Sequence, residues 1–178
     1  MALAFVRVSL GVALVHRHTV AERDRGQKLL TEAIDVFMCG GHNLGELPVV
    51  HVYLARERAR RGDLDGAIPL MHAAVDDLVR EGQLQAWGVP ATGVLAETLI
   101  DRGTVADLAQ AEAAIERLAQ APTEARLALR DVWLLRLHVL LARARGDAAA
   151  YAHLRDRYSD MAKSAGFEGH ITWAEAMP

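Results

Sequence analysis

The histidines and the single cysteine are the residues best suited to metal or nucleophilic chemistry. His16 and His18 lie two residues apart, and Cys39 and His42 form a second, loose pair. Zinc sites normally use tight ligand pairs at fixed spacing, and a nucleophilic cysteine needs a histidine base beside it. The sequence offers neither pattern. We therefore expect no metal site and interpret Cys39 as a structural thiol at a helix end.

Charged residues suggest other kinds of site. The basic run 56–61 could bind a phosphate or an acidic peptide, but its cations also suit the negative end of a solvated helix. Glu57, Glu97 and Glu112 are separated along the chain and are expected on solvated helix faces, not as a carboxylate pair. The Arg-Gly-Asp triplets at 61–63 and 145–147 are interpreted as turns between helices and not as adhesion motifs.

A spacing of 41–43 residues organises the chain. Three Arg-Gly pairs, at 61–62, 102–103 and 145–146, each close one helical pattern and open another, and Pro48 and Pro90 lie 42 positions apart at the heads of helices. A fixed period of this size is typical of stacked helical hairpins, each burying its apolar face against its neighbours. An ordinary irregular all-α domain with a coincidental glycine spacing is the alternative.

The apolar periodicity predicts eight helices and a last helical turn, all in one domain over 1–178. The helices are expected at about 2–15, 21–39, 48–61, 64–81, 90–102, 104–120, 124–145 and 148–164, with the turn at 171–177. The repeats would cover about 1–41, 47–82, 88–120 and 124–164, followed by a tail at 165–178. Trp87, Trp133 and Trp173 are expected to be wedges in the core rather than a stacking platform.

Composition limits the classes of partner. Hydrophobic residues make up 52% of the 178 residues and aromatic residues only 5%, which disfavours β-sandwich and barrel cores. A net charge of −3 gives no general attraction to nucleic acid or to an anionic membrane. The apolar N-terminal run is too short to span a bilayer, and a lone cysteine suits a reducing compartment. We expect a cytoplasmic protein that binds neither nucleic acid nor membrane.

Small and large residues recur where two helices of a hairpin would meet. Ala67, Met71 and Ala74 follow Gly62 at a small, large, small spacing, and the second helix offers Gly26, Leu30 and Ala33 at equivalent places. This pattern resembles degenerate tetratricopeptide repeats, lengthened from the usual period. It implies a tetratricopeptide-like superhelical array of about four antiparallel helical hairpins.

A second resemblance covers most of the chain. The stretches RGDLDGAIPLMHAAVDDLVREGQ and LLRLHVLLARARGDAAAYAHLRDRYSDMAKSAGFEGHITWAEAMP resemble the C-terminal region of large mycobacterial and related actinobacterial regulators. Those proteins join a class III adenylate/guanylate cyclase or a LuxR-type DNA-binding domain to a STAND-type ATPase and a helical array. The resemblance implies a sensing or partner-binding arm, as a truncated remnant or a stand-alone version.

The catalytic motifs of such regulators are missing here. The chain has no G-x-x-x-x-G-K-[ST] phosphate loop, no helix-turn-helix with a basic recognition helix and no paired aspartates for a cyclase metal site. We expect neither enzymatic activity nor a bound cofactor. Any cyclase, ATPase or LuxR designation would be inherited from domains that this sequence lacks.

Two classes of function therefore lead, with an enzyme as a distant third. The first is a signal-sensing module that binds a protein or peptide on a concave surface, with His51, Arg56, Glu97 and Arg136 as possible contacts. The alternative is a small-molecule sensor whose inter-helix pocket is lined by Trp87, His51 or His138. The first helix, apolar on most sides, predicts a possible homodimer through Phe5, Val8 and Val12.

Overall fold

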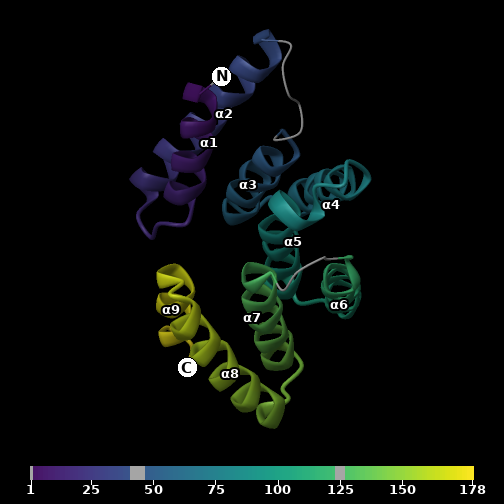
Figure 1. The fold of residues 1–178 in the computed structure, drawn as a ribbon. Helices are drawn as coiled ribbons and strands as arrows, with labels where there is room; N and C mark the ends of the chain where they lie inside the picture. The colour runs from purple at the N-terminus through teal and green to yellow at the C-terminus, as the bar shows by residue number, and fades with distance from the viewer. Residues whose placement is uncertain (1, 41–46, 123–126) are drawn as a thin grey trace. The chain divides into compact units, whose positions relative to one another are not determined.

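The computed structural model describes residues 2–40, 47–122 and 127–178, and over these residues the fold is all-α, as predicted (Figure 1). No strand occurs in these three ranges. The helices group into two compact units, one up to Leu95 and one from Ala96 onward. The single domain expected over 1–178 stays a prediction. The elements are α1 (Ala2–Val15), α2 (Val20–Gly40), α3 (Leu47–Arg60), α4 (Leu64–Arg80), the π-helical turn η2 (Leu84–Gly88), α5 (Val89–Arg102), α6 (Val105–Gln120), α7 (Ala128–Ala144), α8 (Ala148–Ala165) and α9 (Glu168–Glu175).

In the first unit, α1 packs against α2 and α3 packs against α4. The first pair meets at two glycines, because a Cβ atom on Gly26 would lie 2.8 Å from the carbonyl oxygen of Gly11. Such a separation is shorter than any relaxed carbon–oxygen contact, so the two backbones touch here only because both residues lack side chains. In the second pair, Ala67 and Met71 are fully buried. The small-residue pattern therefore marked close helix approaches correctly.

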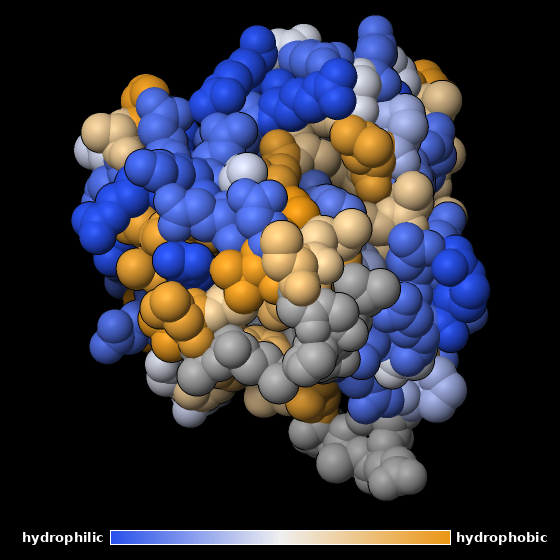
Figure 2. Space-filling view, turned by 90° about the horizontal axis from the view of Figure 1, so that it is seen from above, coloured by the Kyte–Doolittle hydropathy of each residue, from blue (hydrophilic) through white to orange (hydrophobic). Residues whose placement is uncertain are grey.

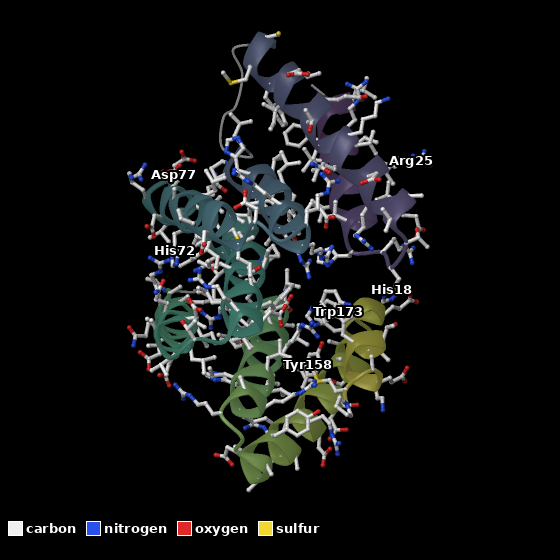
Figure 3. All side chains as sticks on the ribbon, turned by 180° about the vertical axis from the view of Figure 1, so that it is seen from behind. His18, Arg25, His72, Asp77, Tyr158 and Trp173 are labelled. Carbon is white, nitrogen blue, oxygen red and sulfur yellow. The ribbon has the colours of Figure 1, made fainter. Side chains whose placement is uncertain are left out.

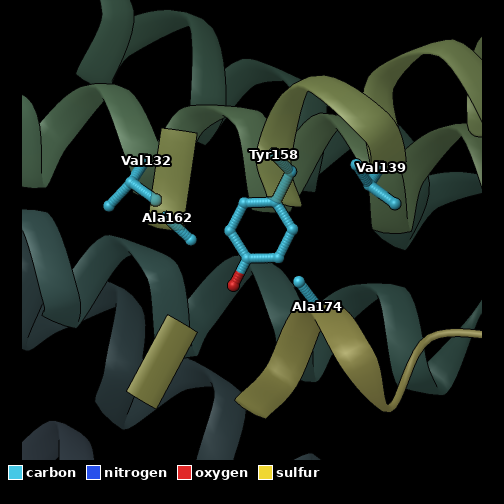
Figure 4. Close-up of a cluster of buried hydrophobic side chains, with 5 residues drawn as sticks. All are labelled: Val132, Val139, Tyr158, Ala162 and Ala174. Carbon is cyan, nitrogen blue, oxygen red and sulfur yellow. The ribbon is translucent and has the colours of Figure 1, made fainter. Parts of the chain in front are cut away.

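In the second unit, α7 packs against α6 and α8, and α9 packs against α8. Tyr158 lies at the centre of the core, with its ring surrounded by small and β-branched side chains (Figure 4). These are Val132, Val139, Ala162 and Ala174. The helix α9 therefore closes this core, whereas the sequence predicted only a last helical turn beginning three residues later.

The turns between helices are the ones that the Arg-Gly pairs predicted. Gly62, Gly103 and Gly146 all have positive φ, at 98°, 74° and 73°, a conformation that favours glycine because a Cβ atom would clash with the backbone. Asp63 and Asp147 then cap the next helix, each accepting a hydrogen bond from the backbone N–H three residues later. The interpretation of both Arg-Gly-Asp triplets as turns is confirmed.

The turn at Arg102-Gly103 is followed by a more extensive cap. Thr104 and Asp107 form a reciprocal capping box at the start of α6, in which each side chain accepts a hydrogen bond from the backbone N–H of the other residue. Arg102 also binds the Asp107 carboxylate, with Nε 2.8 Å from Oδ2. Hydrogen bonds from Arg102 hold the pKa of the buried Asp107 far below its usual value, with further help from Thr104.

Several expectations about exposure were wrong. Val8 is 1% exposed, and Phe5 and Val12 are only half-exposed, so they do not form an outward face of α1. Glu57 and Glu97 are 3% and 7% exposed and do not lie on solvated faces. In each case packing between helices decided the exposure, and the apolar period of the helix itself did not.

Candidate binding groove

A groove of about 530 Å³ runs along α3 in the first unit, between α2 and α4. Its lining positions on α3 extend from His51 to Arg58, with Arg61 just beyond the helix end. At a rise of about 1.5 Å per residue this makes the groove about 15 Å long. Its floor and walls come from Leu54, Ala55, Leu70, Ala73 and Ala74, and its polar margin comes from Gln27, Thr31, His51, Arg58, Arg61, Asp63 and Asp77.

The apolar middle of the groove depends on the face that α4 presents. Leu70 is 47% exposed, although large apolar side chains are normally buried. Ala73, one turn further along, is also exposed and leaves room beside it. The groove therefore offers an unfilled apolar surface wide enough for a bulky side chain.

One end of the groove is basic, but its arginines are already paired. Arg58 Nε lies 2.5 Å from Asp63 Oδ2, and Arg61 donates to Asp24 and Gln27 at 2.9 and 2.6 Å. Gly66 makes room for the first pair, since a Cβ atom there would lie 2.7 Å from the Arg58 guanidinium. The backbone N–H of Gly66, and then Arg58, lower the pKa of the Asp63 carboxyl.

These ion pairs are exposed and therefore exchangeable. The side chains of Arg58 and Asp63 are 51% and 46% exposed, and those of Arg61 and Asp24 are 57% and 56% exposed. Exposed pairs contribute only about 0–1 kcal/mol. A carboxylate on a ligand could replace either aspartate at little cost in free energy. Asp77, which α4 contributes to the groove margin and Figure 3 labels, pairs with Arg80 at 2.7 Å.

Of the four residues predicted for a concave surface, only His51 lines this groove. Arg56 is half-buried and lies 3.0 Å from His16 Nδ1. Glu97 and Arg136 belong to the second unit and are joined to each other, Oε1 to Nε, at 2.6 Å. Both of their charges are thus held inside that unit, and neither Trp87 nor His138 is among the groove residues.

Arg60, the remaining arginine of the basic run, also makes contacts inside the first unit. Arg60 donates to the Val15 carbonyl oxygen at 2.7 Å and to the buried Glu57 carboxylate at 2.5 Å. Arg23 lies 3.5 Å from the same carboxylate. The run 56–61 thus ties α3 to its neighbours, which leaves Arg58 and Arg61 as its contribution to the groove.

The second unit contains a buried polar network that sequence reasoning missed. The Arg136 guanidinium lies 4.3 Å from the centre of the Trp173 ring and also interacts with the Tyr158 hydroxyl. That hydroxyl lies 2.9 Å from His170 Nδ1. Figure 3 labels Tyr158 and Trp173, which α8 and α9 contribute. The sequence analysis named Arg136 and Trp173 separately, as a surface contact and a core wedge, and no local pattern linked them to each other or to Tyr158 and His170.

Burial governs the ionisation of this network. It raises the pKa of Tyr158 to about 12, and, together with Arg136, it lowers the pKa of His170 to about 4. Burial also disfavours a charged Arg136, but the Glu97 carboxylate outweighs this and raises the pKa of the guanidinium. At neutral pH Tyr158 and His170 are therefore both uncharged, and the Tyr158 hydroxyl and His170 Nδ1 share a hydrogen bond.

The structure describes only part of the histidine and cysteine pairs that the sequence analysis considered. Cys39 is exposed near the end of α2, and His42 lies outside the described residues. In the part of the chain that the structure describes, no three His, Cys, Asp or Glu side chains are placed to share a metal ion. The helices of that same part are all too short or too polar to cross a membrane.

Comparisons with protein-family models, with curated proteins and with solved structures find no match to this chain.

Proposed function

We propose that this chain is a non-catalytic binding module whose groove along α3 holds a short protein or peptide segment. The observation that carries the proposal is Leu70, half-exposed in a groove with an apolar middle and exchangeable ion pairs at its ends. An extended segment of about four or five residues would fill the 15 Å length, at about 3.3 Å per residue. The segment that suits the groove best would place an apolar side chain beside Leu70 and an acidic group near Arg58 and Arg61.

The groove can be tested with short random peptides displayed on phage and selected against the whole chain. Peptides that occupy the groove should lose affinity by about tenfold or more when Ala73→Trp fills it. Ala109→Trp is the matched control, because Ala109 is also an exposed helical alanine but lies on α6. Selected peptides that bind both variants equally well would show that they use another surface and would refute this function.

A small-molecule sensor is the second candidate, and the groove volume favours it. About 530 Å³ lies within the range of about 300–1,000 Å³ that is usual for ligand pockets. A metabolite that occupies the groove should raise the midpoint of thermal unfolding of the wild type, and Ala73→Trp should abolish that shift. If peptides bind and no metabolite does, the first proposal is favoured.

The origin of the module is a further part of the proposal. We propose that it corresponds to the C-terminal arm of cyclase–STAND or LuxR-type regulators and acts in the cytoplasm without catalysis. Support for this origin comes from the two stretches of sequence that carry the resemblance. Cyclase and ATPase reading frames next to the gene would support this origin. ATP hydrolysis or nucleotide cyclisation by the rigorously purified chain would contradict the proposal that the module acts without catalysis.

A further inference from the structure

The charged end of the groove is where one bound segment can be distinguished from another. Apolar residues reach the surface at several places on the face that Figure 2 shows, so an apolar contact beside Leu70 does not by itself select a segment. Arg58 and Arg61 are the arginines of the groove lining, and both are already paired. The arginine that gives up its partner more easily is therefore the one that an acidic side chain of a ligand can bind.

Arg58 has fewer hydrogen bonds to give up than Arg61. Among the described residues, the Arg58 guanidinium donates one hydrogen bond, from Nε to Oδ2 of Asp63. Arg61 instead donates to Asp24 and to Gln27, which both belong to α2. Exchange at Arg61 would break this connection between the end of α3 and α2, whereas exchange at Arg58 breaks a single exposed pair. An incoming carboxylate therefore replaces the partner of Arg58 more easily.

Asp63 can release Arg58 and still cap α4, because its two carboxylate oxygens have different partners. Oδ1 accepts a hydrogen bond from the backbone N–H of Gly66 at 2.9 Å, and Oδ2 accepts the one from Arg58. A free carboxylate can bind a guanidinium through two parallel N–H groups at once. Exchange would thus replace one hydrogen bond to Arg58 with a bidentate pair, and the start of α4 would keep its cap.

The second Arg-Gly-Asp turn, at 145–147, has no arginine at the matching place. Asp147 caps α8 in the same way, with Oδ1 2.9 Å from the backbone nitrogen three residues later. Ala142 stands where the first turn has Arg58, five residues before the capping aspartate. An alanine also takes the place of Gly66, where a Cβ atom would lie 2.7 Å from the Arg58 guanidinium. The ion pair is therefore not required by this kind of turn and is a feature of the groove.

We infer, on the basis of the proposed function of the groove, that an acidic side chain of the bound segment displaces Asp63 from Arg58. Asp63 is then an internal competitor for that arginine and sets how strongly the groove prefers acidic segments. The competitor is charged at neutral pH, because hydrogen bonds from the Gly66 N–H and then from Arg58 lower the pKa of its carboxyl. A segment without an acidic side chain leaves the pair in place and gains only the apolar contacts.

The test compares the wild type with Asp63→Asn. Asparagine caps helices as well as aspartate does, but its one oxygen is needed for the Gly66 N–H, and its NH2 group cannot accept a hydrogen bond from Arg58. The probe is a phage-selected peptide whose affinity Ala73→Trp reduces, made with an amidated C-terminus and with either Glu or Gln at its acidic position. In fluorescence anisotropy, Asp63→Asn should strengthen binding of the Glu peptide by about two- to fivefold and leave the Gln peptide unchanged.

Asp147→Asn is the matched control, because it removes the same charge from a capping residue that does not line the groove, and it should leave both affinities unchanged. Arg58→Gln tests the contact from the other side and should make the two peptides bind equally. Circular dichroism shows whether each variant stays folded.

Three results would overturn the inference. Asp63→Asn could bind the Glu peptide no better than the wild type does, it could strengthen both peptides alike, or the peptides that occupy the groove could carry no acidic residue. The proposed function of the groove would survive each of these results as long as Ala73→Trp still weakens the peptides. If Ala73→Trp weakens none of them, that function fails first, and the inference fails with it.

Discussion

Acidification should weaken the second unit through one buried histidine. His170 is 7% exposed and lies beside Trp133 and Trp173, with ring centres 5.2 and 5.0 Å away. The Tyr158 hydroxyl shares a hydrogen bond with Nδ1 of the neutral ring, 2.9 Å away. A protonated ring would place a positive charge in a buried site that already faces the positive Arg136. Burial first, and then Arg136, explain why the folded chain resists protonation of this group.

The size of the effect follows from the difference in pKa between the folded and unfolded states. Above about pH 6.5 His170 is neutral in both states, and its full contribution to stability is present. Between that value and the folded-state pKa of about 4, only the unfolded chain binds a proton, so the free energy of unfolding falls as the pH falls. The loss is about 2 kcal/mol by pH 5 and about 3 kcal/mol in all.

The assay is urea unfolding at several pH values from 7.5 to 5, followed by tryptophan fluorescence. A Trp87→Phe background leaves Trp133 and Trp173, both next to His170, as the reporters. His170→Asn keeps an oxygen that can accept the Tyr158 proton but cannot titrate in this range. It should be less stable at pH 7.5 and should lack the loss of about 2 kcal/mol.

His153→Asn is the matched control, because His153 is exposed on α8. It should keep the full dependence of the wild type on pH. If His170→Asn loses as much stability as the wild type between pH 7.5 and 5, the reasoning about burial is refuted. The same conclusion would follow if NMR showed the His170 ring titrating near pH 6.5.

Three other predictions concern stability and can be checked by the same unfolding measurement. Gly26→Ala should cost about 1–3 kcal/mol, because its Cβ atom would meet the Gly11 carbonyl oxygen, whereas Gly169→Ala has open space and should be neutral or slightly stabilising. Asp107→Ala should cost about 2–3 kcal/mol, since it removes one half of the capping box of α6 and the partner of Arg102, and Asp107→Asn should cost less; equal costs would argue against the charge. Ala67→Leu should cost about 1–3 kcal/mol, and an unchanged midpoint would contradict close packing there.

The groove was only partly predictable from the sequence. The basic run 56–61 and His51 were identified as possible binding residues, and His51, Arg58 and Arg61 do line the groove. The acidic partners were not, because Asp24 lies 37 residues before Arg61 and nothing local connects them. The apolar middle of the groove forms only when α2, α3 and α4 pack together, so no single segment of the sequence predicts it.

The features that could be predicted from the sequence are local ones. Glycine at positive φ, an aspartate or threonine cap and an apolar period are properties of a few adjacent residues, and they placed the turns at Gly62, Gly103 and Gly146 correctly. Close contacts between helices can also be recognised from a few residues, since only a residue without a large side chain lets two backbones approach closely. This explains why residue size and spacing alone were enough to identify Gly26 and Ala67 as contact positions.

The direction in which each side chain faces depends instead on how the helices pack together. The helix α1 is apolar on most sides, so its sequence could not say that Val8 turns inward and Leu3 outward; the contact with α2 decides it. Glu97 similarly became an interior residue only because Arg136, 39 positions later, reaches its carboxylate. A charge is stable in the interior only with a partner. That partner is supplied by the packing of distant helices, which a period in the sequence does not encode.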